Sequence, residues 1–287
     1  MSFTVMIDGE LVSPELARVS VFDRGFLYGD SVFETLRTYG GKLFALDEHL
    51  ARLERSAASV FIPLPIGLDA LRSEVLATLA AHPAVERYAR LTLTRGIGRT
   101  LGLDPELADQ PTRVIVVTAL DAPSAELYER GISVITFRAE RPSDASGVAA
   151  AKIGNYLLAV LAMRAARERG AREALLVDSH GNVLEGATSN VFAVVHGKLV
   201  TPPESAPILP GITRAHVLRL AAAQKLEVEL RALARTELDQ AAEVFVCSSI
   251  REILPVVSID GRLVGTGVPG PTTRALTRYF REATGSG

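Results

Sequence analysis

The alternation of apolar and polar positions in the first 120 residues predicts several strands and two helices. Strand-like runs at 3–7 and 10–12 flank the turn-forming pair Asp8-Gly9, which is typical of a β-hairpin. An apolar stripe at helical spacing follows Asp47, which we expect to cap that helix. Strands and helices in blocks, without regular alternation, are typical of an α+β domain. Further elements are predicted at 31–39, 68–81, 87–94 and 113–120, and the Gly-rich loop RGIGRTLGLDPE separates the last two.

After residue 120 the pattern breaks, and a second block of strands and helices follows. We expect a small α+β domain at 1–120, an interdomain linker region at 121–131 and a large cofactor-binding domain at 132–287. Asn155 is predicted to cap a long helix that ends at Gly170. The other predicted strands cover 132–137, 173–177, 191–195, 198–201, 226–230, 243–247 and 254–259, and the other predicted helices cover 125–130, 212–224 and 272–282.

The composition is that of a globular protein without a preference for polyanions. Apolar residues make up 48% of the 287 residues, and 31 basic residues against 33 acidic ones give a net charge of −2. Nucleic acid is therefore not expected as a partner, because phosphate contacts need clustered Lys and Arg. No apolar run approaches the ~20 residues that span a bilayer, so no membrane partner is expected either. The single Cys247 and the lack of a signal-like start favour a cytoplasmic protein.

Lysine is scarce in this chain, and one lysine stands in an unusual setting. Only four of the 31 basic residues are lysines. Lys152 lies in GVAAAKIGNYLLAV, among small and apolar residues, with no acidic residue within seven positions. Burial lowers the pKa of an amine and frees its lone pair, so such a lysine either extends to water or is retained for its chemistry. The other three, Lys42, Lys198 and Lys225, follow turns or end a helical pattern.

Common catalytic motifs are missing, but several residues could assist a reactive lysine. The sequence has no HExxH, CxxC, GxSxG or GxxxxGK motif, and no metal site is expected. Pro210-Gly211 precedes a predicted helix, so the amides of Ile212 and Thr213 can hold an anion at its positive end. Glu185, beside an apolar strand, is either functional or a solvated strand-end carboxylate. Ser248 and Ser249 lie at the end of a predicted strand. Their hydroxyls either bind the same anion or start a turn.

Six motifs occur in the order that is expected of one family. They are DRGFLYGDSVFETLR at 23–37, HLARL at 49–53, Lys152 with NYL at 155–157, LEGATSN at 184–190, LPGITR at 209–214 and EVFVCSSIREILPV at 243–256. The sequence resembles the class IV, fold-type IV pyridoxal-phosphate aminotransferases, a group that holds branched-chain aminotransferases, D-amino-acid aminotransferases and aminodeoxychorismate lyases. This resemblance, which runs from about Phe3 to Phe280, implies a two-domain α+β enzyme with the cofactor in the interdomain cleft, working as a homodimer.

The resemblance also implies roles for individual residues. Lys152 is expected to form the Schiff base with pyridoxal 5′-phosphate and then to move the proton in catalysis. Glu185 is expected to pair with the pyridinium nitrogen and keep it protonated. Tyr156, at a spacing compatible with one helix face shared with Lys152, is expected to donate to the phenolate oxygen of the ring. Arg52 is expected to hold the phosphate together with the backbone amides of Ile212 and Thr213. Ser248 or Ser249 is expected to add a hydroxyl.

The implied substrates are amino acids and 2-oxo acids. Alternation places Phe33 and Arg37 on one face of their strand, and Tyr88 and Arg90 on one face of theirs, so both strands can line a pocket. An arginine beside an aromatic residue and two hydroxyls suits carboxylate binding, which favours Arg90. In the implied homodimer, the partner's small domain is expected to contribute residues from around Tyr28 or from the 97–103 loop. The substrate-binding candidates are Tyr28, Phe33, Arg37, Tyr88, Arg90 and Arg99.

The motifs identify the family more specifically than they identify which type of enzyme within the family this protein is. Tyr88-Ala89-Arg90 is similar to the Tyr-x-Arg signature of branched-chain aminotransferases, and Arg99-Thr100-Leu101 lacks the Arg-x-His of bacterial D-amino-acid enzymes. In contrast, Thr35 stands where branched-chain enzymes usually have glycine, and CSSIREILPV is closer to the lyase and D-type groups. We therefore expect a branched-chain-like L-amino-acid transaminase. The alternatives are a D-amino-acid or (R)-amine transaminase and an aminodeoxychorismate lyase.

Overall fold

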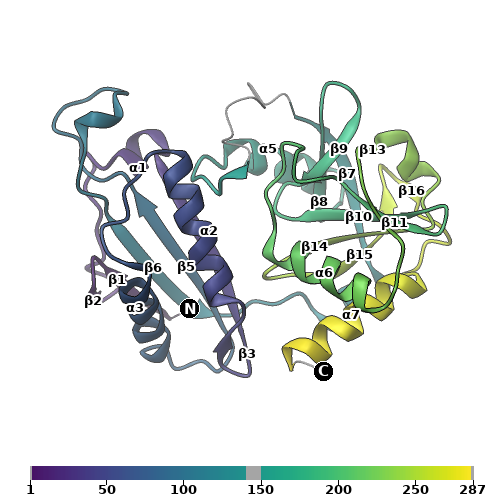
Figure 1. Ribbon diagram of the computed structural model, residues 1–287, viewed down its shortest axis with the longest axis horizontal. Helices are drawn as coiled ribbons and strands as arrows, with labels where there is room; N and C mark the ends of the chain where they lie inside the picture. The colour runs from purple at the N-terminus through teal and green to yellow at the C-terminus, as the bar shows by residue number, and fades with distance from the viewer. Residues whose placement is uncertain (1, 140–149, 286–287) are drawn as a thin grey trace. The chain divides into compact units, whose positions relative to one another are not determined.

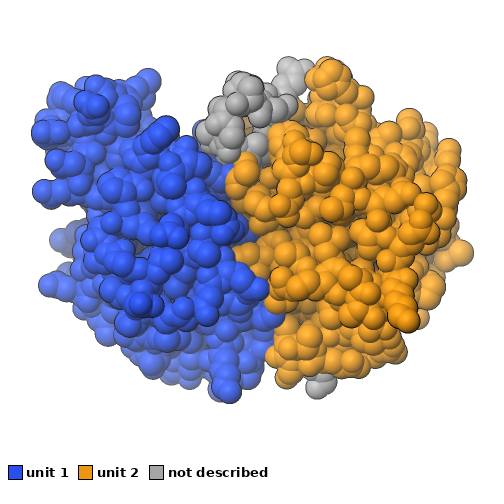
Figure 2. Space-filling model, in the orientation of Figure 1, with its two compact units in different colours: residues 1–121, 151–155 blue, residues 122–150, 156–287 orange. Residues whose placement is uncertain are grey.

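The computed structural model describes residues 2–139 and 150–285, which form two compact units. Unit 1 comprises the described residues of 1–121 together with 151–155, and unit 2 comprises those of 122–150 and 156–287 (Figure 2). The chain therefore enters unit 2 at residue 122, returns to unit 1 for five residues and then enters unit 2 again. None of the described helices is long and apolar enough to cross a membrane.

Unit 1 is built on a six-stranded antiparallel sheet with the strand order β2-β1-β6-β5-β3-β4 (Figure 1). Helices α2 and α3 pack on one face of this sheet, where Leu50, Leu53 and Val75 meet Val32 and Leu36 in a buried core. The strands are β1 (Phe3–Ile7), β2 (Glu10–Val12), β3 (Ser31–Tyr39), β4 (Lys42–Leu43), β5 (Arg87–Thr94) and β6 (Arg113–Ala119), and the helices are α1 (Arg24–Tyr28), α2 (Leu46–Ser59) and α3 (Leu68–Ala80).

The register between β3 and β5 confirms the prediction that Phe33 and Arg37 share one face of β3 and that Tyr88 and Arg90 share one face of β5. The two strands are antiparallel neighbours in the sheet. Directly opposed residues of an antiparallel pair point to the same face. The face away from α2 and α3 therefore carries the opposed pairs Phe33–Thr92, Thr35–Arg90 and Arg37–Tyr88.

Unit 2 contains a ten-stranded mixed sheet with the path β12-β11-β10-β14-β15-β7-β8-β9-β13, and β16 pairs with β15. Helix α5 packs on β7 and β8, and β9 also contacts β10 although the two are not neighbours in the path. The strands are β7 (Ile132–Arg138), β8 (Glu173–Val177), β9 (Asn182–Gly186), β10 (Asn190–Val195), β11 (Lys198–Thr201), β12 (Val228–Leu230), β13 (Leu233–Ala234), β14 (Glu243–Ser248), β15 (Glu252–Ile259) and β16 (Arg262–Leu263), and the α-helices are α4 (Ala125–Arg130), α5 (Leu157–Glu168), α6 (Ile212–Ala223) and α7 (Pro271–Thr284).

Two predictions about the segment after Lys152 are wrong. Helix α5 begins at Leu157, and its N-cap is Tyr156 instead of Asn155. Lys152 lies outside the helix, so it does not share a helix face with Tyr156. The reason is that residues 152–154 pair with β3, and an extended chain that pairs with a strand cannot also form the first turn of a helix.

The remaining differences are local. Helix α2 begins at Leu46, so Asp47 lies in its first turn instead of capping it. The short helix α1 and strand β9 were not predicted from the pattern. Both are five residues long, and glycine lies within each, at Gly25 and Gly186. Such segments carry too little periodicity to predict an element.

Candidate active site

The residues that the motifs single out are divided between the two units. The sequence predicted one site but gave no indication that Lys152 and Glu185 belong to different compact units. Unit 1 contains Tyr28, Phe33, Arg37, Arg52, Tyr88, Arg90, Arg99 and Lys152, and unit 2 contains Tyr156, Glu185, Ile212, Thr213, Ser248 and Ser249.

In unit 1, a short extended segment carries Lys152 along the edge of β3. The Phe33 N–H donates to the Lys152 carbonyl at 3.0 Å, and the Gly154 N–H donates to the Ser31 carbonyl at 2.7 Å. A Cβ on Gly154 would lie 2.0 Å from the Ser31 Oγ, so a larger residue here would displace the Ser31 side chain. The Lys152 N–H also donates to Ser56 Oγ of α2 at 3.2 Å. The backbone of Lys152 is therefore fixed by two elements of unit 1.

The ring of Phe33 brings two cations together beside that backbone. The ring centroid lies 4.5 Å from Lys152 Nζ and 3.7 Å from Arg90 Cζ. Phe33 is only 2% exposed, and a shielded cation–π contact contributes about 1–2 kcal/mol. The Arg90 Nε also donates to Thr92 Oγ1 at 3.3 Å. Two cations that share one ring repel each other, so the arrangement favours an anion, such as a carboxylate, beside them.

Arg52 lies on the other face of β3, in a buried cluster with Glu34 and His49. The Arg52 Nε and Nη2 donate to the two Glu34 oxygens at 2.8 and 2.7 Å, and His49 Nδ1 lies 2.7 Å from Glu34 Oε2. Burial raises the pKa of Glu34, but the hydrogen bonds and charges of Arg52 and His49 outweigh burial and lower that pKa to about 2. Burial also lowers the pKa of His49. The carboxylate therefore stays charged and holds the guanidinium of Arg52 in one orientation.

Arg52→Ala should destabilise the protein, because it leaves the buried Glu34 carboxylate without its cation. Removing one partner of a buried ion pair typically costs about 3–5 kcal/mol. Urea unfolding followed by circular dichroism measures the free energy of unfolding. The double variant Arg52→Ala with Glu34→Gln should recover at least half of the loss, whereas Arg55→Ala, an exposed arginine on the same helix, should change little. If Arg52→Ala were as stable as the wild-type protein, the assignment of Arg52 as the cation that compensates the buried Glu34 carboxylate would be wrong.

The other substrate-binding candidates lie elsewhere in unit 1. Arg37 is buried and its guanidinium carbon lies 4.2 Å from the centroid of the Tyr39 ring. The Tyr28 hydroxyl accepts a hydrogen bond from a backbone N–H of the 97–103 loop at 3.2 Å. Arg99, exposed in that loop, donates to a carbonyl beyond it at 2.8 Å. The structure thus joins Tyr28 to the 97–103 loop and joins Phe33, Arg90 and Lys152 to one another.

In unit 2, Glu185 is a buried carboxylate that the backbone orients. It is 8% exposed, which excludes the solvated strand-end alternative. Its Oε2 accepts the N–H of Leu209 at 3.0 Å, and Asn190 Nδ2 donates to the Leu209 carbonyl at 2.9 Å. A Cβ on Gly211 would lie 1.8 Å from the Asn190 Oδ1, so a larger residue here would displace the Asn190 amide from this turn. The LPGITR turn is therefore tied to two residues of the LEGATSN motif.

Helix α6 begins directly after Gly211, as predicted, and its first turn offers an anion site. The first amides of the helix, including those of Ile212 and Thr213, have no acceptor within it. The Thr213 Oγ1 is buried and has no hydrogen-bond partner among the described residues. A buried hydroxyl without a partner is costly, so an anionic oxygen at this helix terminus would stabilise it. Ser248, half-buried at the end of β14, accepts the Arg251 N–H at 3.4 Å.

Sequence reasoning missed several buried polar residues, among them Glu34, His49 and Glu173. A signal existed for Glu34, because alternation places it on the same face as Val32 and Leu36, and an acidic residue on an apolar face needs a partner. No comparable signal marks Glu173, which stands at the beginning of a strand, where an exposed carboxylate is common.

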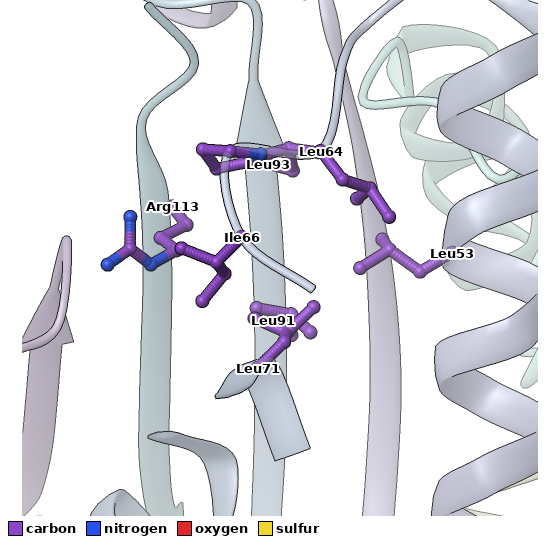
Figure 3. Close-up of a pocket in the computed structure, with 8 residues that line it drawn as sticks. Leu53, Leu64, Ile66, Leu71, Leu91, Leu93 and Arg113 are labelled. Atoms are coloured by element: carbon purple, nitrogen blue, oxygen red, sulfur yellow. The ribbon is translucent and has the colours of Figure 1, made fainter. Parts of the chain in front are cut away.

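A small cavity in unit 1 is unrelated to these residues (Figure 3). It lies on the α2 and α3 side of the sheet and leaves no room for a water molecule. We interpret it as a packing gap of the core. It is lined by Leu53, Leu64, Pro65, Ile66, Leu71, Leu91, Leu93 and Arg113.

Known proteins match the chain over nearly its whole length. The family model described as amino-transferase class IV matches residues 31–259. A Methanocaldococcus jannaschii protein provisionally named a branched-chain-amino-acid aminotransferase is 40% identical over 279 residues, which are 97% of this chain and 95% of that protein. D-alanine aminotransferase of Bacillus licheniformis is 34% identical and covers 97% of this chain and 96% of its own length. The crystal structure of the Escherichia coli branched-chain amino acid aminotransferase has a TM-score of 0.92 at 33% identity, over 100% of this chain and 96% of that one.

The fold and these matches define a fold-type IV aminotransferase with mixed α and β content. The chain belongs to the class IV aminotransferase family, whose members are pyridoxal-phosphate enzymes. The resemblance stated from the motifs, the α+β fold class and the prediction of an aminotransferase are thereby confirmed.

Proposed function

We propose that this protein is a pyridoxal-phosphate-dependent transaminase that moves an amino group between branched-chain or other apolar L-amino acids, glutamate and 2-oxo acids. Lys152 carries this proposal, because its backbone is fixed at two points and its amine shares the Phe33 ring with a second cation. Amino transfer needs such an amine beside a group that binds carboxylate. The test is formation of L-glutamate from L-leucine and 2-oxoglutarate by purified protein supplied with the cofactor.

The described residues fit the cofactor at both of its polar ends. The buried Thr213 hydroxyl and the first amides of α6 suit the phosphate, and Arg52 would add a charged donor. Glu185, fixed by the Leu209 N–H, suits a protonated ring nitrogen. When bound, pyridoxal phosphate supplies an aldehyde that exchanges amino groups and a ring that takes up electrons from the substrate carbon.

Each of these residues has a distinct task in the proposed reaction. Lys152 Nζ would hold the cofactor between turnovers and would carry the substrate's proton during them. Glu185 would hold a proton at the ring nitrogen, and its burial would strengthen that interaction. Tyr156 is proposed to donate to the ring oxygen. Thr213 and Arg52, with Ser248 or Ser249, would hold the phosphate in place without touching the reacting carbon.

Arg90→Leu should lower activity on dicarboxylates more than on apolar substrates. Arg90 lies beside Phe33 and Lys152, so it is the proposed partner of the second carboxylate of glutamate. We expect kcat/KM for L-glutamate to fall at least ~10-fold more than kcat/KM for L-leucine, which is about 1.4 kcal/mol of differential binding. Half-reaction kinetics measure both values. Arg87→Leu, on the other face of β5, is the control. Equal losses on both substrates would mean that Arg90 binds the common α-carboxylate or supports the fold.

A D-amino-acid transaminase is the second candidate, because the D-alanine aminotransferase of Bacillus licheniformis matches almost the whole chain. The same half-reactions with D-alanine and D-glutamate separate the two. A wild-type preference for the D enantiomers would replace the branched-chain proposal, and Arg37 or Arg99 would then become the candidates for carboxylate binding.

We further propose that a second copy of this chain covers an apolar patch on unit 1, formed by α1 and the 97–103 loop. Phe26, Leu101 and Leu103 are 71%, 67% and 77% exposed. The buried Arg24 joins the two parts by donating to two carbonyls of the loop at 2.7 and 3.1 Å. Large exposed apolar patches typically mark protein interfaces, and the resemblance to class IV aminotransferases implies a homodimer.

Phe26→Asp should weaken a dimer formed through this patch, because it places a charge where an apolar ring would be buried. We expect the dissociation constant to rise by at least ~10-fold, as for a central apolar contact. Analytical ultracentrifugation over a range of concentrations measures the dimer fraction. Phe61→Asp is a matched control, since Phe61 is 80% exposed outside the patch. An unchanged dimer in Phe26→Asp would place the interface elsewhere.

A further inference from the structure

A fully buried carboxylate in unit 2 has no task in the reaction described above. Glu173, the first residue of β8, is 0% exposed. Its Oε2 accepts the Thr188 hydroxyl at 2.8 Å and forms an ion pair with Arg251 Nη1. Its Oε1 accepts the N–H of Ala174 at 3.1 Å. A buried charge is retained only where its partners compensate for lost hydration, and here those partners come from two separate turns.

The two turns are the ones that carry the proposed cofactor ligands of unit 2. Thr188 lies in the turn between β9 and β10, three residues after Glu185. Arg251 lies in the turn between β14 and β15, three residues after Ser248, and its N–H donates to Ser248 Oγ at 3.4 Å. One carboxylate therefore connects the turn that follows the ring-nitrogen ligand with the turn that bears the phosphate hydroxyls.

The surroundings of Glu173 leave little room for adjustment. A Cβ on Gly186 would lie 2.2 Å from the Ser189 Oγ and 3.4 Å from the Glu173 carboxyl carbon. The Ser189 hydroxyl itself lies 3.5 Å from Glu173 Oε2. The turn after Glu185 is thus packed closely against the carboxylate, so a change at Glu173 is transmitted to it.

We propose that Glu173 is a positioning residue, which holds the β9–β10 and β14–β15 turns in register so that Glu185 and the phosphate hydroxyls act on one cofactor. This inference rests on the proposed function. Glu173 acts through Thr188 on one side and through Arg251 on the other, and it does not touch the cofactor or the substrate.

Glu173→Gln keeps the size of the side chain but removes the charge that Arg251 needs. We expect the dissociation constant for pyridoxal phosphate to rise at least ~10-fold and kcat to fall by a similar factor, because both turns lose their common anchor. Glu243→Gln is the matched control. Glu243 is also a buried carboxylate of unit 2 and also accepts a threonine hydroxyl, from Thr273 at 2.7 Å, but it lies at the opposite end of β14 from Ser248.

Two further variants separate positioning from stability. Thr188→Val removes one hydroxyl at constant shape and should lower kcat ~3-fold or more while the cofactor affinity changes less than ~2-fold. Arg251→Met should do the reverse, raising the dissociation constant for pyridoxal phosphate ~5-fold or more while that for pyridoxal, which lacks the phosphate, stays within ~2-fold. Urea unfolding of each variant shows how much of any change follows from lost stability.

The experiment compares these four variants with wild-type protein by equilibrium dialysis against both cofactor forms and by single-turnover kinetics. The positioning role of Glu173 is supported if Glu173→Gln loses cofactor affinity and Glu243→Gln does not, while both variants lose a similar amount of stability. Equal effects of the two glutamine variants, or cofactor affinity and kcat unchanged in Glu173→Gln, would overturn it. A wild-type protein that does not bind pyridoxal phosphate would instead refute the proposed function.

Discussion

Lys152→Ala is expected to abolish transamination while the protein still folds and binds pyridoxal phosphate non-covalently. The contacts that fix this position use its main chain, namely the carbonyl with Phe33 and the N–H with Ser56, so alanine can keep them. The substitution removes only the amine that would bond the cofactor and move the proton. Because a positioned acid or base alone contributes ~10²- to 10⁴-fold, we expect turnover to fall by at least ~10⁴-fold when both tasks are lost.

The measurement is the single-turnover rate with L-leucine, together with the absorbance of the bound cofactor. Lys225→Ala is the control and should retain wild-type turnover, since Lys225 is exposed at the end of α6. Borohydride reduction followed by peptide mapping identifies the bonded amine independently. Turnover above one thousandth of wild type in Lys152→Ala, or a pyridoxyl group on Lys42, Lys198 or Lys225, would remove Lys152 from its proposed role.

Glu185→Gln is expected to lower kcat by ~10²-fold or more with less than a ~3-fold change in the dissociation constant for pyridoxal phosphate. The amide is isosteric, and its oxygen can still accept the Leu209 N–H. It carries no charge, however, so it cannot stabilise a proton on the ring nitrogen, and the ring becomes a poorer acceptor of electrons. The phosphate contacts proposed at Thr213 do not involve Glu185. The expected loss therefore falls on the chemical step and not on binding.

A comparison of kcat with cofactor affinity separates this role from a structural one. Glu252→Gln is a suitable control, because Glu252 is another buried carboxylate of unit 2, paired with Arg281 at 3.0 Å. It should lose stability without a selective loss of kcat. Near-normal turnover in Glu185→Gln, or loss of cofactor in proportion to loss of turnover, would contradict the proposed role.

Much of unit 1 was predictable from the sequence, because the alternation in 31–39 and 87–94 reports directly which side chains share a face. The pairing of Phe33 with Arg90 follows from those faces once the two strands are neighbours. The α6 N-terminus was predictable for a similar reason, since Pro210-Gly211 is a local signal for the start of a helix. In each case the information lies within about ten residues of sequence.

The position of Lys152 could not be predicted in this way. Its apolar neighbours are typical of a helix, and a helix was predicted from Asn155 onward. That helix does form, from Leu157, but residues 152–154 pair with β3, whose residues lie about 120 positions earlier, and no local pattern specifies such a partner. The Glu34, His49 and Arg52 cluster is similar, because only the packing of α2 on β3 shows which carboxylate meets which cation.

Because residues 151–155 return to unit 1, this unit can complete its folding only after that segment has been synthesised. While the chain is being synthesised, its first 121 residues can form most of the sheet, but the edge of β3 at Ser31 and Phe33 then lacks the backbone partner it has in the finished protein. An unpaired strand edge invites association with other chains. Nascent unit 1 is therefore most exposed to misassembly until Lys152 itself has emerged and docked, and a truncated product that ends near Asp121 should be aggregation-prone as well as inactive.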